Sequence, residues 1–155
     1  MFDPIKRARD SYARQNFLRF LGTELESLEP GRCTITLAIR PELTQQHGFA
    51  HAGVITTLAD TAAGYAAYST MPENASVLTV EFKVNLIKPA MGQALRAEAN
   101  TIKAGRTLSV VEANVFAIDG GNEALAARMQ ATMMCLAGKA DDPSISQRQE
   151  TERKN

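Results

Sequence analysis

The segment Ala52–Thr70 limits what this chain can fold into more than any other part of the sequence. Small and apolar residues, chiefly Ala, Gly, Val, Leu and Thr, fill most of its positions. The segment predicts a helix without a polar face, and such a helix is usually buried on most sides. Other elements must therefore surround it, and a β-sheet with one apolar face is the obvious candidate.

Strand patterns on both sides of this helix supply such a sheet. Two strands, Gly22–Glu29 and Arg32–Arg40, are separated by the turn Pro30-Gly31, and apolar and polar residues alternate in the second of them. After the helix, the same alternation continues through Leu78–Leu86. Turn signals then separate three further strands, at residues 93–103, 107–118 and 124–136. The short connections predict an antiparallel meander, so the fold class is α+β.

Both ends of the chain are rich in charge. Pro4–Leu21 predicts an amphipathic N-terminal helix, in which apolar residues recur among Lys and Arg. We expect its apolar side to dock on the core, although a basic amphipathic helix is also typical of a membrane surface or a transit peptide. From Gly138 onward the chain carries eight charged residues among eighteen, a composition typical of disorder. We therefore expect one domain over residues 1–138 and a disordered charged tail over 139–155.

Overall charge and cysteine content argue against several kinds of partner. Lys and Arg together number 17, as do Asp and Glu, so no overall field favours nucleic acid or an anionic membrane. Cys33 and Cys135 lie in apolar, strand-like runs, which favours buried free thiols in a reducing compartment. The first residues lack the apolar run of a secretory signal, and polar residues interrupt the longest apolar stretch. We expect a cytoplasmic protein without a nucleic acid or membrane partner.

Asp60 is the candidate catalytic group. It is the one formally charged residue between Leu43 and Pro72, and it lies in the middle of the apolar helix. A carboxylate in such a place is costly to bury unless it is paired, protonated or used in chemistry. The alternative is a structural acid that is hydrogen-bonded to a neighbouring threonine, such as Thr56, Thr57 or Thr61.

The start of the same helix is suited to hold a carbonyl oxygen. Backbone N–H groups in the first helical turn have no partner within the helix, and together with the helix dipole they favour a developing oxyanion. The small residues Ala52 and Gly53 allow close approach, and Gln45 offers a side-chain donor from the preceding loop. An ordinary glycine-containing helix start is the alternative. His47 and His51 are four residues apart, but Gly48 between them argues against a regular helix there, so no metal is expected.

The distance between these two groups predicts an oligomer. Ala52 and Asp60 are eight residues apart, which is roughly 12 Å along one helix. A carbonyl held at Ala52 must lie within about 3.5 Å of the attacking atom. One helix cannot do both, whereas two antiparallel copies across a two-fold axis can. We expect a homodimer or a dimer of dimers.

Three sequence runs resemble a known family. His47–Ala67 resembles the signature of hotdog-fold acyl-CoA thioesterases of the phenylacetic-acid-degradation (PaaI-like) type, and Val80–Ala90 and Ala104–Thr107 are similar to that family's sheet. His51-Ala52-Gly53 stands where the family usually has His-Gly-Gly. The resemblance covers Gly22–Gly138. It implies the hotdog fold, an antiparallel sheet wrapped around one long central helix, and dimers that hydrolyse acyl-CoA to free acid and CoA without a cofactor.

The resemblance also implies roles for single residues. Ala52 would polarise the thioester carbonyl through its N–H, and Asp60 would be the nucleophile or the general base that activates water. Gln45 falls where relatives place a polar side chain near the carbonyl, and His51 flanks the oxyanion site. Gly64 stands where some relatives carry a Ser or Thr that holds the attacking water, which leaves that role vacant or moved.

Substrate contacts and the exact activity are less constrained. Lys88, Lys103 and Arg106 are candidates to hold the CoA phosphates, although solvated turn charge is the alternative for each. The full set of expected substrate-binding residues is Gly53, Gly64, Asn85, Lys88, Lys103 and Arg106. Alternative functions are a non-catalytic acyl-CoA sensor and a hotdog dehydratase or hydratase. The sequence leaves open whether the acyl group is aromatic or aliphatic.

Overall fold

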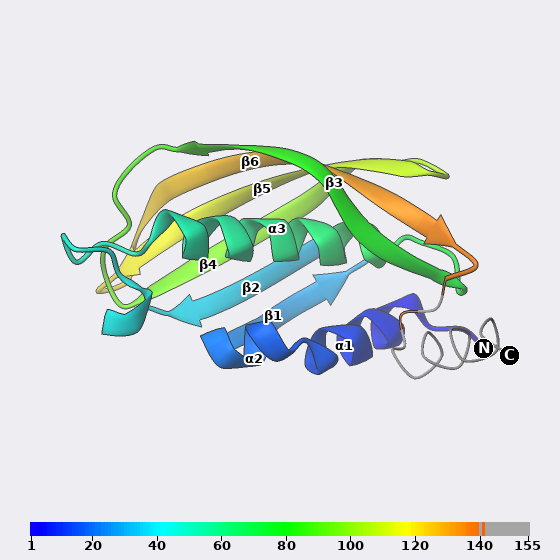
Figure 1. Ribbon diagram of the computed structural model, residues 1–155, viewed down its shortest axis with the longest axis horizontal. Helices are drawn as coiled ribbons and strands as arrows, with labels where there is room; N and C mark the ends of the chain where they lie inside the picture. The colour runs from blue at the N-terminus through cyan, green and yellow to red at the C-terminus, as the bar shows by residue number, and fades with distance from the viewer. Residues whose placement is uncertain (140, 142–155) are drawn as a thin grey trace, which may run out of the picture.

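The computed structural model describes residues 1–139 and 141, and it consists of one antiparallel sheet wrapped around one long helix (Figure 1). The helix is α3, Ala52–Tyr68. The six strands lie in the order β1-β2-β4-β5-β6-β3. Their bounds are Thr23–Glu29 for β1, Arg32–Ala38 for β2, Ala75–Leu86 for β3, Ala94–Ala104 for β4, Leu108–Asp119 for β5 and Asn122–Ala137 for β6. The predicted α+β architecture is confirmed.

Small residues on α3 let the helix lie close against the sheet. The alanines that face the strands are fully buried, namely Ala59, Ala62, Ala63, Ala66 and Ala67. The sheet supplies the bulk, because large side chains on the inner faces of its strands are buried against this helix; they include Ile35, Leu95, Val111, Val115 and Met133. Burial of one such side chain contributes about 1.5–3 kcal/mol. The composition of α3 therefore follows from its place inside the sheet.

The strand order differs from the predicted meander at β3. Strands β4, β5 and β6 do form a meander, and the turn between β5 and β6 places Gly120 and Gly121 at φ +55° and +84°, as a two-residue hairpin requires. β3, however, pairs with β6, and β4 pairs with β2. The segment 87–93 therefore crosses three strand spacings, roughly 15 Å. Seven extended residues reach roughly 23 Å, so the connection is long enough to cross.

The N-terminal segment is two helices where a single helix over 4–21 was predicted. α1 spans Pro4–Arg14 and α2 spans Asn16–Leu21, and Gln15 between them is extended at φ −74° and ψ 106°. The Gln15 side chain donates a hydrogen bond to the Tyr65 hydroxyl on α3, which fixes the break. Ala8 is buried against the core, so the expected docking of this segment is confirmed.

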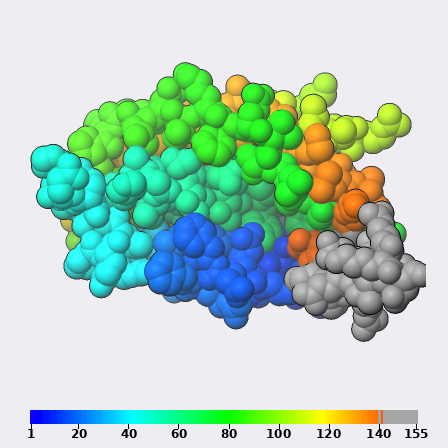
Figure 2. Space-filling view, viewed as in Figure 1, coloured from blue at the N-terminus to red at the C-terminus, as the bar shows by residue number. Residues whose placement is uncertain are grey.

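One side of α3 remains uncovered in the described chain. Figure 2 shows a strip of α3 at the surface between the N-terminal helices and β3. β3 pairs only with β6 among the described strands, so its other edge is open. Val80, Phe82 and Leu86 on this strand are 52%, 44% and 54% exposed. Long apolar strand edges are generally covered in native proteins, whereas this one is open in the described chain.

Two further expectations concern membranes and the C-terminus. No helix among residues 1–139 and 141 combines the length and the hydropathy needed to cross a membrane. Apart from Lys139 and Asp141, the predicted disordered tail over 139–155 lies outside the described residues.

Candidate active site

Asp60 lies half-buried on the uncovered side of α3. Its Oδ1 accepts a hydrogen bond of 2.8 Å from the Thr79 hydroxyl on β3. Burial raises the pKa of the Asp60 carboxyl above its ordinary value, and the Thr79 hydrogen bond opposes this shift. Within the described chain no hydrogen bond joins Asp60 to Thr56, Thr57 or Thr61, and Thr57 instead donates to the Gly53 carbonyl. One carboxylate oxygen is thus held, and Oδ2 accepts no hydrogen bond from the described residues.

Thr79 is a site residue that the sequence analysis missed. It pairs with Met133 across β3 and β6, and its side chain faces α3. The next residue, Val80, forms a β-bulge, since Thr79 is opposite Met133 and Glu81 is opposite Thr132. A bulge changes which residues of a strand face inward. The simple alternation in the sequence places Thr79 on the polar, outward face of the strand. It therefore gave no sign that Thr79 would face Asp60.

In the first turn of α3, one backbone donor has no partner within the described chain. His51 is the N-cap, and its Nδ1 accepts a hydrogen bond of 2.9 Å from the Gly53 N–H. A neutral imidazole that accepts at Nδ1 carries its proton on Nε2. The Ala52 N–H has no partner among residues 1–139 and 141. His51 thus caps the helix, and the Gly53 N–H is already used in that contact. The Ala52 N–H is the donor that remains for a carbonyl oxygen.

Gln45 and Ala52 line the same cavity. Gln45 starts a tight turn, in which its carbonyl accepts from the Gly48 N–H at 2.9 Å and its side-chain oxygen accepts from the His47 N–H. The cavity has a volume of about 390 Å³, and Lys88 also lines it. The expected oxyanion donor, its polar neighbour and one candidate phosphate ligand are therefore brought together at the start of α3.

Asp60 lies in a different cavity. This second hollow has a volume of about 370 Å³, and Gly64, Tyr65 and Thr79 also line it. Both cavities open along α3 and β3, the first beside Leu86 and the second beside Thr79. The carboxylate and the helix start of one chain thus occupy separate places, in agreement with the distance of roughly 12 Å along a helix that their spacing predicts.

The remaining candidate substrate ligands are dispersed. Lys103 lies near the end of β4 and Arg106 in the turn between β4 and β5, whereas Lys88 follows the far end of β3. The β4–β5 turn and the start of α3 lie at opposite ends of the molecule in Figure 1. Asn85 is exposed, and its side-chain oxygen accepts a 3.1 Å hydrogen bond from Lys83. Of Asn85, Lys88, Lys103 and Arg106, it is Lys88 that lines one of the two cavities described above. Among the described residues, no three His, Cys, Asp or Glu side chains cluster as metal ligands do.

Comparison with known proteins identifies the family to which the chain belongs. The family model described as the thioesterase superfamily matches residues 47–124, which include the start of α3, Asp60 and Thr79. The chain belongs to the thioesterase superfamily. A crystal structure of a thioesterase family protein from Silicibacter pomeroyi is 47% identical, with a TM-score of 0.85 over 86% of this chain and 98% of that one.

Two other relatives agree with this assignment. The PaaI protein of E. coli, from the phenylacetic acid degradation operon, has the same fold with a TM-score of 0.76 at 18% identity, over 88% of this chain and 98% of that one. The 1,4-dihydroxy-2-naphthoyl-CoA hydrolase of Listeria monocytogenes is 26% identical over 61% of this chain and 77% of its own length. The predicted thioesterase family is confirmed, and the fold of this thioesterase is the predicted hotdog fold, which it shares with PaaI.

Proposed function

We propose that this thioesterase hydrolyses an acyl-CoA to the free acid and CoA, in two sites that a homodimer shares. In each site, the Ala52 N–H of one protomer holds the thioester carbonyl oxygen, and the Asp60 carboxylate of the other protomer acts on the carbonyl carbon. The observation that carries this proposal is the separation of the two groups into two cavities along one open side of α3. With an antiparallel second copy across the open edge of β3, the Ala52 cavity of each chain would face the Asp60 cavity of the other.

The reaction needs only groups that such a dimer supplies. As a general base, the Asp60 carboxylate takes a proton from water while the water oxygen bonds to the carbonyl carbon. The oxyanion that develops is stabilised by the Ala52 N–H and the positive end of the α3 dipole. When the oxyanion collapses, the carbon–sulfur bond breaks and the proton passes to the CoA thiolate. Alternatively, the carboxylate attacks the carbonyl carbon directly, the carbon–sulfur bond breaks and releases the CoA thiolate, and water then hydrolyses the anhydride.

Neighbouring residues support the two ends of this site. Thr79 holds one oxygen of Asp60, and His51 holds the first turn of α3 in place through the Gly53 N–H. Gln45 offers a side-chain amide near the carbonyl. Lys88 lines the same cavity as Ala52, so it is the basic residue best placed to meet the CoA phosphates there.

Release of free thiol from a panel of acyl-CoAs tests the proposal. We compare the wild type with Asp60→Asn, because asparagine has the same shape and can still accept the Thr79 hydrogen bond. General acid–base catalysis typically contributes about 10²–10⁴-fold, so we expect turnover to fall by that factor with the oligomer unchanged. Binding of acyl-CoA without thiol release would instead indicate a sensor. A changed acyl group on an intact thioester would indicate a dehydratase or hydratase.

A further inference from the structure

Two cavities follow one another along α3, between the N-terminal helices and β3. The first is the cavity of about 370 Å³ beside Asp60, and the second has a volume of about 340 Å³. From the first to the second, the lining residues pass from Asp60 to Tyr68 on α3 and from Thr79 to Ala75 on β3. Tyr68 is eight residues beyond Asp60, which is roughly 12 Å along the helix axis. The two cavities are therefore successive parts of one hollow along α3.

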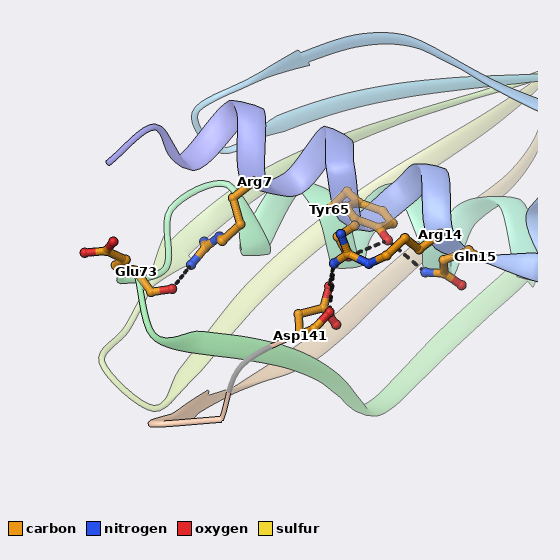
Figure 3. Close-up of polar contacts among 7 residues, drawn as sticks. Arg7, Arg14, Gln15, Tyr65, Glu73 and Asp141 are labelled. Carbon is orange, nitrogen blue, oxygen red and sulfur yellow. Dashed lines mark hydrogen bonds and ion pairs between the residues drawn. The ribbon is translucent and has the colours of Figure 1, made fainter. Parts of the chain in front are cut away.

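An ion pair lies where the two cavities meet. Arg14 is the last residue of α1, and Asp141 follows the end of β6, where Ala137 pairs with Ala75 of β3. Arg14 Nη2 donates to the Asp141 backbone carbonyl at 2.7 Å and to its carboxylate Oδ2 at 3.3 Å (Figure 3). Asp141 lines both cavities, and Arg14 lines the second. The pair thus joins α1 to the β3–β6 side and closes the first cavity at the end away from Asp60.

This partition is held by exposed contacts over a fixed floor. The side chains of Arg14 and Asp141 are 45% and 38% exposed, and an exposed ion pair shifts an equilibrium by only about 1.4- to 5-fold. Beneath the pair, Tyr65 and Tyr68 of α3 pack edge to face with their ring centres 6.3 Å apart, and both are buried. A chain that displaced the ion pair would continue along the same helix into the second cavity.

The second cavity can receive the end of an alkyl chain. Tyr68 and Ala75 line it from α3 and β3. Two of its charged residues, Lys6 and Asp10, pair with each other at 2.6 Å, and Arg7 donates to backbone carbonyls at the end of α3. Lys and Arg side chains offer apolar stems while their charged heads reach water. An alkyl chain can therefore lie along these stems without separating a buried charge from its partner.

We propose that Arg14 and Asp141 set the length of the acyl chain that this thioesterase accepts. The proposal rests on the proposed function of Asp60, with the acyl group in the cavity beside it. With the pair closed, the chain has the length of α3 from Asp60 to Tyr65, roughly 7–8 Å, which suits a hexanoyl group. With the pair open, it has roughly 12 Å, which suits a decanoyl group. A long chain must therefore break the contacts between Arg14 and Asp141, whereas a short chain leaves them in place.

The ratio of kcat/KM for decanoyl-CoA to kcat/KM for hexanoyl-CoA measures the effect of the pair. The CoA part is the same in both substrates, so its contribution cancels. Asp141→Ala removes the ion pair and keeps the backbone contact, and we expect the ratio to rise about 1.4- to 5-fold. Arg14→Ala removes both contacts, so the ratio should rise by more than in Asp141→Ala. Asp141 lies beyond the last strand, so its variant decides the matter if Arg14→Ala does not fold.

Glu42→Ala is the matched control. Glu42 forms an exposed ion pair with Arg40 at 3.7 Å and lines neither cavity, so its ratio should equal that of the wild type. Salt gives a second readout, because the Debye length falls from about 10 Å at 0.1 M to about 3 Å at 1 M ionic strength. The wild-type ratio should therefore rise more steeply with salt than the ratio of Arg14→Ala, which has no pair to screen.

The outcomes separate this inference from the proposed function. An unchanged ratio in folded Arg14→Ala and Asp141→Ala, or an equal rise in Glu42→Ala, would overturn the role of the pair and leave the thioesterase mechanism intact. Release of thiol from aromatic acyl-CoAs, but from neither alkyl substrate, would overturn it as well. Failure to release thiol from any acyl-CoA of the panel would overturn the proposed function itself.

Discussion

Replacing Thr79 by valine tests how Asp60, the proposed catalytic acid, is held. Valine keeps the shape of threonine and suits a strand, so the variant should fold. It removes the hydrogen bond of 2.8 Å from the Thr79 hydroxyl to Asp60 Oδ1, the one hydrogen bond that this carboxylate accepts within the described chain. Hydrogen bonds to charged groups contribute about 1.5–3 kcal/mol. If the transition state needs the held carboxylate, kcat/KM should fall roughly tenfold to 150-fold.

The pH dependence of the same variant has a defined sign. Burial raises the pKa of Asp60, and the hydrogen bond from Thr79 lowers it. Without the hydroxyl, burial acts unopposed and the pKa of Asp60 rises further. The proposed mechanism needs the ionised carboxylate, so the acidic limb of the profile of kcat/KM against pH should move to higher pH. A purely structural loss would lower the profile without moving it.

Thr132→Val is the matched control for this experiment. Thr132 lies across the same pair of strands, but its hydroxyl contacts Glu81 on the outer face of the sheet, at 3.2 Å. Both variants lose one threonine hydroxyl from the β3–β6 ladder, and only Thr79→Val should change rate and pH profile. If Thr79→Val keeps the wild-type rate and profile, the hydroxyl does not position Asp60 and that part of the account is wrong.

Three further expectations concern stability. Gly64→Ala should raise the free energy of unfolding by about 0.5–1 kcal/mol, because alanine is favoured in a helix interior and the added methyl meets no atom within 4 Å. An unchanged or lower free energy of unfolding in urea would contradict this expectation. Asp60→Asn should stabilise the protein near neutral pH. Because the pKa of Asp60 is raised in the folded state, the folded state loses stability as pH rises and the carboxyl ionises. Lower stability of the variant in thermal melts at pH 7 would refute this. Arg7→Met should lower the free energy of unfolding by at least about 2 kcal/mol, because Arg7 donates hydrogen bonds to the carbonyls of Tyr68 and Met71 at the end of α3. An unchanged midpoint of unfolding in urea would contradict this expectation.

Local patterns were enough to predict the central helix and the strands, and to single out Asp60 as a candidate. The period-two strands and the small-residue helix follow from side-chain periodicity, which each segment carries by itself. Asp60 was found because one charge stands out in an apolar run. The spacing between Ala52 and Asp60 is likewise fixed by helix geometry alone, and the two separate cavities agree with it.

Features that depend on distant contacts were not predictable. The break at Gln15 interrupts a continuous amphipathic pattern, and its partner Tyr65 is fifty residues away. Strand β3 alternates regularly in sequence, yet the bulge at Val80 decides that Thr79 faces Asp60. The place of β3 beside β6 depends on how a connecting segment crosses the sheet. Pairing between distant strands leaves no local sequence signal, so the meander was predicted in its place.

The central claim is that each active site combines Asp60 of one chain with the Ala52 N–H of another. Two inactive variants test it, Asp60→Asn and Ala52→Pro. Proline suits this position because Ala52 is the first residue of α3 and its N–H has no partner among the described residues. His51 before it already has the extended conformation, at φ −64° and ψ 139°, that a following proline requires.

Co-expression of the two variants gives the decisive measurement. Random pairing makes about half of the dimers mixed, and in a mixed dimer one site has both lesions while the other has an intact Asp60 and an intact Ala52 N–H. We predict that thiol release from acyl-CoA recovers to about a quarter of the wild-type rate. If mixed dimers are confirmed by mass and no activity returns, both groups act within one chain and the shared site is refuted.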